Sequence, residues 1–162
     1  MKVLGIDPGT AACGYGIVHD DGGRLRRLKG GCWRTSPRDR PEARLTTIFD
    51  GVRALIAEHA PDAVALEESF VGADARIALF VGQARGAALV AAASAGVECS
   101  EYAPARVKQA VCGFGRAEKG QMSRMVRVLL ALEIEPPTSH EADALAVAIC
   151  HALTPPLARL AG

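Results

Sequence analysis

Short apolar segments and longer segments with helical periodicity alternate along the chain. The segments at 3–6, 13–18, 24–34, 63–66 and 97–102 predict strands. Asp20-Asp21-Gly22-Gly23, between the second and third, is a strong hairpin signal. The fourth and fifth each follow a helical segment, as parallel strands do. This order predicts an α/β fold with a five-stranded mixed sheet, three antiparallel and then two parallel strands, and helices on both faces.

Apolar residues three and four positions apart predict helices in most of the remaining chain. Prolines at 41 and 104 open two of them, and Thr138 to Glu141 has the capping-box pattern before an apolar run. The predicted helices cover 41–59, 74–95, 104–112, 118–132 and about 139–153. We expect 1–153 to form one domain and 154–162, which contains two prolines, to be a flexible tail.

The predicted helix at 74–95 carries a stripe of small residues. Ala78, Gly82 and Gly86 recur every four residues, a spacing that lets another backbone approach closely. The stripe predicts either close packing on the sheet or an interface between subunits. The sequence leaves both interpretations open.

Composition narrows the class of protein. The 162 residues include five cysteines, an odd number without Cys-x-x-Cys spacing, which argues against a disulfide framework and a structural zinc site. Gln83 and Arg85 interrupt the most apolar window, and a signal-peptide hydrophobic region is absent, so we expect a cytoplasmic protein without a membrane segment. The formal net charge of +1 neither demands nor excludes nucleic acid, because an acidic site can offset a basic surface.

Acidic residues follow two of the predicted strands, and a third begins the last helix. Asp7 ends the first strand and Glu67 ends the first parallel strand, so their carboxylates converge if the two strands are neighbours. His140 and Asp143 lie three residues apart on one face of the last helix. Three acids and an imidazole would repel one another and be poorly solvated without divalent cations, so the pattern favours a metal site.

Each of these residues also has an ordinary structural interpretation. Asp7 precedes Pro8-Gly9 and is typical of a turn aspartate. His140 and Asp143 lie in a helical first turn, where the helix dipole favours acidic residues. The residue pattern alone does not choose between these interpretations and the metal site.

Several ordered motifs are spread over nearly the whole chain. They are Gly5-Ile6-Asp7-Pro8-Gly9-Thr10, Gly14-Tyr15-Gly16, Ala65-Leu66-Glu67, Gly82-Gln83-Ala84-Arg85-Gly86, Val107-Lys108-Gln109, Ala117-Glu118-Lys119 and Ala142-Asp143-Ala144-Leu145-Ala146. Together they resemble the RuvC family of Holliday-junction resolvases. The first motif alone would be weak, because actin-like sugar kinases and heat-shock ATPases begin similarly.

The resemblance implies a ribonuclease-H-like fold and a homodimer that makes paired, symmetric nicks in four-way DNA junctions during recombination and repair. It also implies a branch-migration complex of the RuvA and RuvB type as partner. Carried over by position, the family's catalytic metal ligands fall on Asp7, Glu67, His140 and Asp143. Two Mg²⁺ or Mn²⁺ ions roughly 3.5 to 4 Å apart would then activate a water and stabilise the leaving 3′ oxygen. Many relatives have aspartate at the position of His140, a departure that bears on metal preference.

A basic segment lies next to the acidic residues in sequence. Between 103 and 127 there are six basic residues against one acid, a local net charge of +5. The basic residues are Arg106, Lys108, Arg116, Lys119, Arg124 and Arg127. This segment predicts a DNA-binding surface, and the alternative is an ordinary solvated helix face.

The resemblance adds roles for individual DNA-binding residues. Lysines matching Lys108 and Lys119 contact DNA in the family, and Phe70 matches an aromatic residue that stacks on bases at the junction centre. An isolated phenylalanine is otherwise more typical of a core. Arg76, in the same loop region as Phe70, and Arg106, in the basic segment, complete the predicted DNA-binding set.

Two other functions remain compatible with parts of the sequence. A junction-binding scaffold with little turnover would be favoured by the loss of an acid, whereas every acid except the one replaced by His140 is present. An actin-like phosphate-binding ATPase fragment would need a second domain, which 162 residues do not supply.

Overall fold

A mixed five-stranded sheet forms the centre of the computed structural model, which describes residues 1–68 and 75–155. Its strands are β1 (Lys2–Asp7), β2 (Ala12–Asp21), β3 (Arg24–Arg34), β4 (Ala63–Glu67) and β5 (Cys99–Tyr102). They lie side by side in the order β3-β2-β1-β4-β5. β1 runs antiparallel to β2 and parallel to β4, so the predicted change from antiparallel to parallel pairing is confirmed and occurs at the centre of the sheet.

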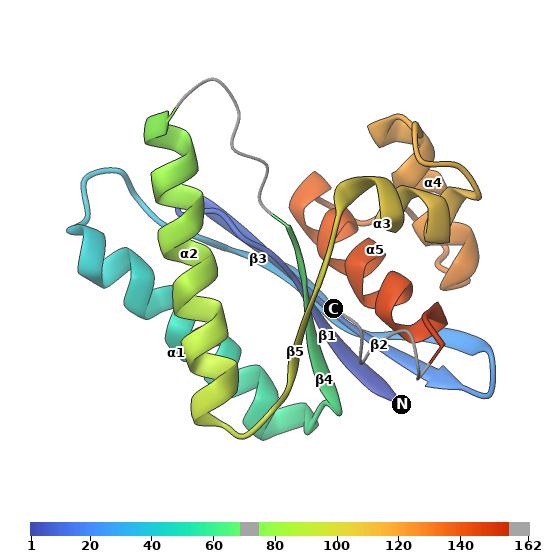
Figure 1. The fold of residues 1–162 in the computed structure, drawn as a ribbon, viewed down its shortest axis with the longest axis horizontal. Helices are drawn as coiled ribbons and strands as arrows, with labels where there is room; N and C mark the ends of the chain where they lie inside the picture. Colours follow the sequence, from blue (N-terminus) through green and yellow to red (C-terminus); the bar gives the residue numbers. More distant parts are fainter. Residues whose placement is uncertain (69–74, 156–162) are drawn as a thin grey trace.

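Helices cover both faces of the sheet, as Figure 1 shows. They are α1 (Pro41–His59), α2 (Ala75–Ser94), α3 (Pro104–Cys112), α4 (Lys119–Leu129) and α5 (Ser139–Leu153). The first two pack on one face and the other three on the opposite face. The predicted α/β class is therefore confirmed.

The central strands are apolar on both sides because each side faces a helical layer. Along β1, Val3 belongs to the core under α3, α4 and α5, whereas Leu4 and Ile6 belong to the core under α1 and α2. All three side chains are fully buried. Each such side chain contributes about 1.5 to 3 kcal/mol of hydrophobic stabilisation.

Helix α5 lies unusually close to the central strands. A Cβ atom at Gly5 of β1 would overlap the carbonyl oxygen of Ala144, and one at Gly14 of β2 would overlap the carbonyl oxygen of His140. Only glycine leaves room for a helix backbone at this separation. Gly5 of β1 and Gly14 of β2 therefore set the distance between α5 and the sheet.

The small-residue stripe of α2 faces away from the sheet. A Cβ atom at Gly82 or Gly86 would meet nothing within 4 Å. The buried residues of the helix are instead four alanines: Ala84, Ala88, Ala91 and Ala92. The interpretation of the stripe as packing on the sheet is thus wrong, because a different row of small residues does that.

Helix α2 is also apolar on its outer face, where Leu79 and Val90 are 61% and 60% exposed. By length and composition it could cross a membrane, a criterion that core helices of soluble proteins also meet, and 22% of its most apolar window is buried. Its alanine row belongs to the core under α1 and α2, which makes it part of the domain.

Several predicted boundaries differ from the structure. The strand predicted at 13–18 extends over Ala12–Asp21, and the strand predicted at 97–102 begins only at Cys99. Helix α4 ends at Leu129, three residues before its predicted end, and Ala131 has a left-handed φ of 50° that a helix does not continue through. Thr154, the first residue of the predicted tail, is buried and donates its hydroxyl hydrogen to the Cys150 carbonyl at 2.7 Å. Residues 156–162 lie outside the described part of the chain.

Candidate active site

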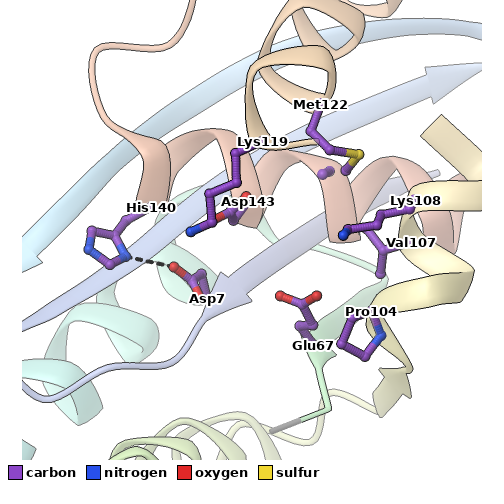
Figure 2. Close-up of a pocket in the computed structure, with 10 residues that line it drawn as sticks. Asp7, Glu67, Pro104, Val107, Lys108, Lys119, Met122, His140 and Asp143 are labelled. Carbon is purple, nitrogen blue, oxygen red and sulfur yellow. Dashed lines mark hydrogen bonds and ion pairs between the residues drawn. The ribbon is translucent and has the colours of Figure 1, made fainter. Parts of the chain in front are cut away.

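The predicted acidic residues meet at the carboxyl ends of the two central parallel strands. Because Ile6 of β1 pairs with Leu66 of β4, the next residues, Asp7 and Glu67, leave the sheet at the same edge. Helix α5 crosses above this edge and adds His140 and Asp143. All four side chains line one pocket of about 330 Å³, shown in Figure 2.

Only one of the two neighbouring glutamates reaches this pocket. Glu67 lines it, whereas the Glu68 side chain is exposed. The Glu68 amide donates a hydrogen bond to the carbonyl oxygen of Tyr102 at 2.9 Å, which continues the pairing of β4 with β5. Since neighbouring strand residues point to opposite faces, this pairing fixes which carboxylate meets Asp7.

His140 is joined directly to Asp7. Its Nδ1 atom lies 2.7 Å from Asp7 Oδ2, and the two side chains are 42% and 20% exposed. An ionised carboxylate only accepts hydrogen bonds, so Nδ1 donates and the lone pair of the neutral ring lies on Nε2. A carboxylate at one ring nitrogen and an available lone pair at the other is the arrangement that orients histidine ligands in metal sites.

The fold opposes ionisation of the other two carboxyls. Burial, followed by the nearby Asp143 and Asp7 charges, raises the pKa of Glu67 to about 7. Burial and the Asp7 charge also raise the pKa of Asp143. Lys119 and Lys108 lower both values without cancelling the rise. Burial and the neighbouring negative charges therefore outweigh the two lysines at both carboxyls.

The two predicted lysines stand at the rim of this pocket. Lys108 comes from α3 and Lys119 from the first residue of α4. Lys119 Nζ lies 3.8 Å from Asp143 Oδ2, and its side chain is 85% exposed. An exposed pair at this distance is weak, so the ammonium group can turn to a phosphate that enters the pocket.

Four apolar residues form one wall of the pocket. Pro104 and Val107 of α3, Met122 of α4 and Ala146 of α5 lie beside the acids. They exclude water from one side of Glu67, which is the physical origin of the burial contribution to its pKa. None of the four was among the predicted site residues, because an apolar residue at helical spacing predicts burial without indicating what it faces.

The chemistry of the donor set fits a hard divalent cation. Three carboxylates supply oxygen ligands, and their mutual repulsion is the energy that a cation would relieve. Within the described residues, no three acidic, cysteine or histidine side chains stand close enough together to hold one ion as they are. Waters and phosphate oxygens would complete the coordination of an ion held by one or two of these carboxylates.

Two other predicted DNA-binding residues, Arg106 and Arg76, do not line this pocket. Arg106 of α3 is exposed, and its guanidinium lies over the Tyr102 ring at 5.2 Å from the centroid. Arg76 is exposed in the first turn of α2. Phe70 lies outside the described residues.

Comparison with known proteins identifies the family. The sequence profile described as "Crossover junction endodeoxyribonuclease RuvC" matches residues 3–151. The chain belongs to the RuvC family. The crossover junction endodeoxyribonuclease RuvC of Heliobacterium modesticaldum is 54% identical over 156 residues, which cover 95% of this chain and 96% of that protein.

Solved structures of family members have the same fold. The RuvC structure from Thermus thermophilus is 42% identical and superposes with a TM-score of 0.88, covering 94% of this chain and 93% of that one. The RuvC of the same organism in complex with a Holliday junction substrate is 40% identical with a TM-score of 0.86. The predicted ribonuclease-H-like fold and family are therefore confirmed.

The family assignment also decides the class of activity. The similar proteins are endodeoxyribonucleases by name, and nucleases of this family depend on a metal ion. The chain is thus an endonuclease that hydrolyses DNA, and the actin-like ATPase interpretation gives way to this one.

Proposed function

We propose that this chain resolves four-way DNA junctions in recombination and repair by cutting two strands symmetrically, with Asp7, Glu67, His140 and Asp143 as its active site. The observation that carries the proposal is the convergence of these side chains in one pocket with two lysines at its rim, in a chain of the RuvC family. Three carboxylates suit phosphodiester hydrolysis assisted by divalent ions.

Asp7, Glu67 and Asp143 would hold two Mg²⁺ or Mn²⁺ ions. Such ions, when bound, supply an activated water and stabilise the leaving 3′ oxygen. Asp7 would contribute to holding both ions, because it lies on the central strand and its charge acts on both Glu67 and Asp143. The apolar wall of Pro104, Val107 and Met122 would limit water on one side of the reacting phosphate.

His140 has two possible roles in this site. Its hydrogen bond to Asp7 supports a role in orienting that carboxylate, with Nε2 directed to a metal ion. Alternatively, Nε2 holds or deprotonates the attacking water. Both roles require the neutral ring, because only that form has a lone pair on Nε2.

Residues around the pocket would bind the junction itself. Lys108 and Lys119 would contact phosphates next to the cleaved bond, because they stand at the rim beside the acids. We place Arg106, Arg76 and Phe70 farther along the DNA, with Phe70 stacking on bases at the junction centre.

Paired cuts require two copies of this site, so we propose a homodimer that works in the cytoplasm with a branch-migration complex of the RuvA and RuvB type. The outer face of α2 is the supporting feature, because it combines exposed apolar residues with the open Gly82 and Gly86 positions. A second copy packed there would bury this face.

A synthetic mobile four-way junction tests the proposal. The protein is incubated with the junction and Mg²⁺ or Mn²⁺, and the nicks are mapped on each strand. Symmetric nicks in two strands, lost in Asp7→Asn, are expected. Binding without nicks in either metal would support the scaffold alternative, and random nicks in linear duplex would contradict junction selectivity.

A further inference from the structure

A buried ion pair holds the first turn of α5 against β3. Glu141 follows His140 and is 2% exposed. Its Oε1 atom accepts a hydrogen bond from Arg27 Nη2 at 2.6 Å, and the same nitrogen lies 3.3 Å from the Gly30 carbonyl oxygen. A carboxylate this deeply buried is stable only with such a partner, so the contact fixes where the Glu141 side chain lies.

A bulge in β3 brings Arg27 and Gly30 to the same face of the sheet. Val18 of β2 pairs with Arg27, but the preceding Ile17 pairs with Lys29, which leaves Leu28 unmatched. Residues three apart in a regular strand point to opposite faces, whereas one extra residue reverses that alternation. Arg27 and Gly30 therefore both face α5.

Gly30 provides the space that the ion pair fills. A Cβ atom at this position would overlap Glu141 Oε1 and would lie 2.8 Å from Arg27 Nε. The bulge, Gly30 and Arg27 thus together form the site on β3 that accommodates the Glu141 carboxylate.

The backbone of Glu141 is restrained at the same time. Its amide donates to the Thr138 hydroxyl at 3.1 Å in the N-cap of α5, and the preceding His140 carbonyl lies directly on Gly14 of β2. The helix is thus fixed at its cap, at its contact with β2 and, through a side chain, at β3. Three separated points prevent both sliding and rotation about the helix axis.

We propose that Arg27 is a positioning residue for the cleavage reaction: through Glu141 it sets the rotation of the first turns of α5 and so holds His140 and Asp143 in register with Asp7. The inference rests on the proposed active site. It assigns to β3, the edge strand, a role in the chemistry although no β3 residue lines the pocket.

Two substitutions at Glu141 separate positioning from stability. Glu141→Gln keeps an oxygen that accepts from Arg27, whereas Glu141→Leu keeps the volume and removes the acceptor. The partly exposed Arg27 can be solvated when its partner is lost, so both variants should melt within about 5 °C of the parent. Arg26→Met is the control, since Arg26, also on β3, forms an exposed pair with Asp21 at the end of β2.

Single-turnover cutting of a saturating four-way junction should fall about tenfold to a hundredfold in Glu141→Leu, because small displacements of reacting groups are costly. It should remain within about threefold in Glu141→Gln and unchanged in Arg26→Met. Junction affinity without divalent ions should be the same in all four proteins. Adding Arg27→Met to Glu141→Leu should change the rate less than about twofold, because Arg27 acts through Glu141.

The opposite results overturn the inference. A parental rate in Glu141→Leu, or equal losses in the Leu and Gln variants, would show that the contact does not position the site. A further tenfold loss on adding Arg27→Met would give Arg27 an independent role.

A titration with Mn²⁺ alone keeps this test separate from the proposed function. If the parent protein cuts no junction, the proposed function fails, and Mn²⁺ affinity measured by calorimetry still decides the positioning role. Binding about tenfold weaker in Glu141→Leu than in Glu141→Gln supports it. Equal affinities refute it.

Discussion

Glu67 shows how the fold of this site opposes the ionisation of its own acidic residues. It ends a buried strand, faces two other carboxyls and has its pKa raised to about 7 mainly by burial. Between about pH 4.5 and pH 7 the folded protein without metal therefore keeps a proton on Glu67. In the unfolded chain the same carboxyl has its ordinary pKa of 4.5 and is ionised over this range. Stability from this group is present below about pH 4.5 and is lost as pH rises through 7.

We predict that Glu67→Gln abolishes nicking, leaves junction binding intact, and stabilises the metal-free protein at pH 8. The gain should be about 1 to 2 kcal/mol after allowance for solvent screening, because the variant lacks the disfavoured charge. It should largely disappear at pH 5, where the parent is protonated. Chemical denaturation in a chelator at both pH values measures it, and Glu68→Gln, an exposed neighbour, serves as control. Inactive Glu68→Gln would show that the strand register is wrong.

His140 makes a second prediction about metal preference. Imidazole nitrogen suits Mn²⁺ better than the hard Mg²⁺, and a neutral ring in place of a carboxylate lowers the attraction for either ion. His140→Asp should therefore raise the ratio of Mg²⁺-dependent to Mn²⁺-dependent cutting.

The measurement uses each metal at saturation and matched pH. An unchanged ratio would remove His140 from the metal ligands and favour its role in holding the attacking water. His59→Asp, remote at the end of α1, controls for the added charge.

At the scale of elements, α3 and α4 carry the basic rim of the site. We predict that Lys108→Ala and Lys119→Ala each weaken junction binding and reduce the slope of log affinity against log salt by about one, since each removes one phosphate contact. Fluorescence anisotropy over a range of salt concentrations, without divalent ions, measures both effects. Arg26→Met, on β3, should leave the slope unchanged. A weaker affinity with an unaltered slope would contradict a direct phosphate contact.

Much of this arrangement could be predicted from local sequence signals. Prolines at 41 and 104 mark the starts of α1 and α3, and Thr138 caps α5 as expected by accepting from the Glu141 amide. The positions of Asp7 and Glu67 at strand ends predicted that they would meet once β1 and β4 paired. These features depend on neighbouring residues or on a simple rule of sheet topology.

The features that escaped prediction depend on contacts between distant residues. The capping pattern suggested that Glu141 would bond within its own helix, but its side chain pairs with Arg27, 114 positions away. That pairing requires the bulge at Leu28, in a strand whose residues do not follow a regular polar-apolar alternation from which the bulge could be located. The stripe in α2 was ambiguous because both faces of that helix are small and apolar.

On the scale of the whole molecule, one copy leaves an apolar face uncovered. The outer side of α2 exposes Leu79 and Val90, and apolar area of this kind on a helix commonly marks an interface. The same helix is anchored by its alanine row to the core, so a second copy packed on it would be held rigidly to the active-site sheet.

We predict that Leu79→Glu yields a monomer at micromolar concentration, because dimerisation would bury the added charge. The parent protein should show twice the mass of the variant by light scattering. Val128→Glu, which places the same charge at a 60% exposed position of α4, should remain dimeric. A monomeric parent would refute the proposed dimer, and a dimeric Leu79→Glu would place the interface elsewhere.

The close packing of the α5 backbone on the glycines of β1 and β2 has a consequence for how the protein folds during synthesis. The other active-site acids lie in the first 67 residues, but His140 and Asp143 arrive on the last helix of the described chain. Until that helix emerges from the ribosome and docks, the nascent sheet has bare glycine surfaces and an incomplete set of ligands. A nascent chain without α5 lacks two of the four residues proposed for the active site, so we expect no DNA cleavage before that helix has docked.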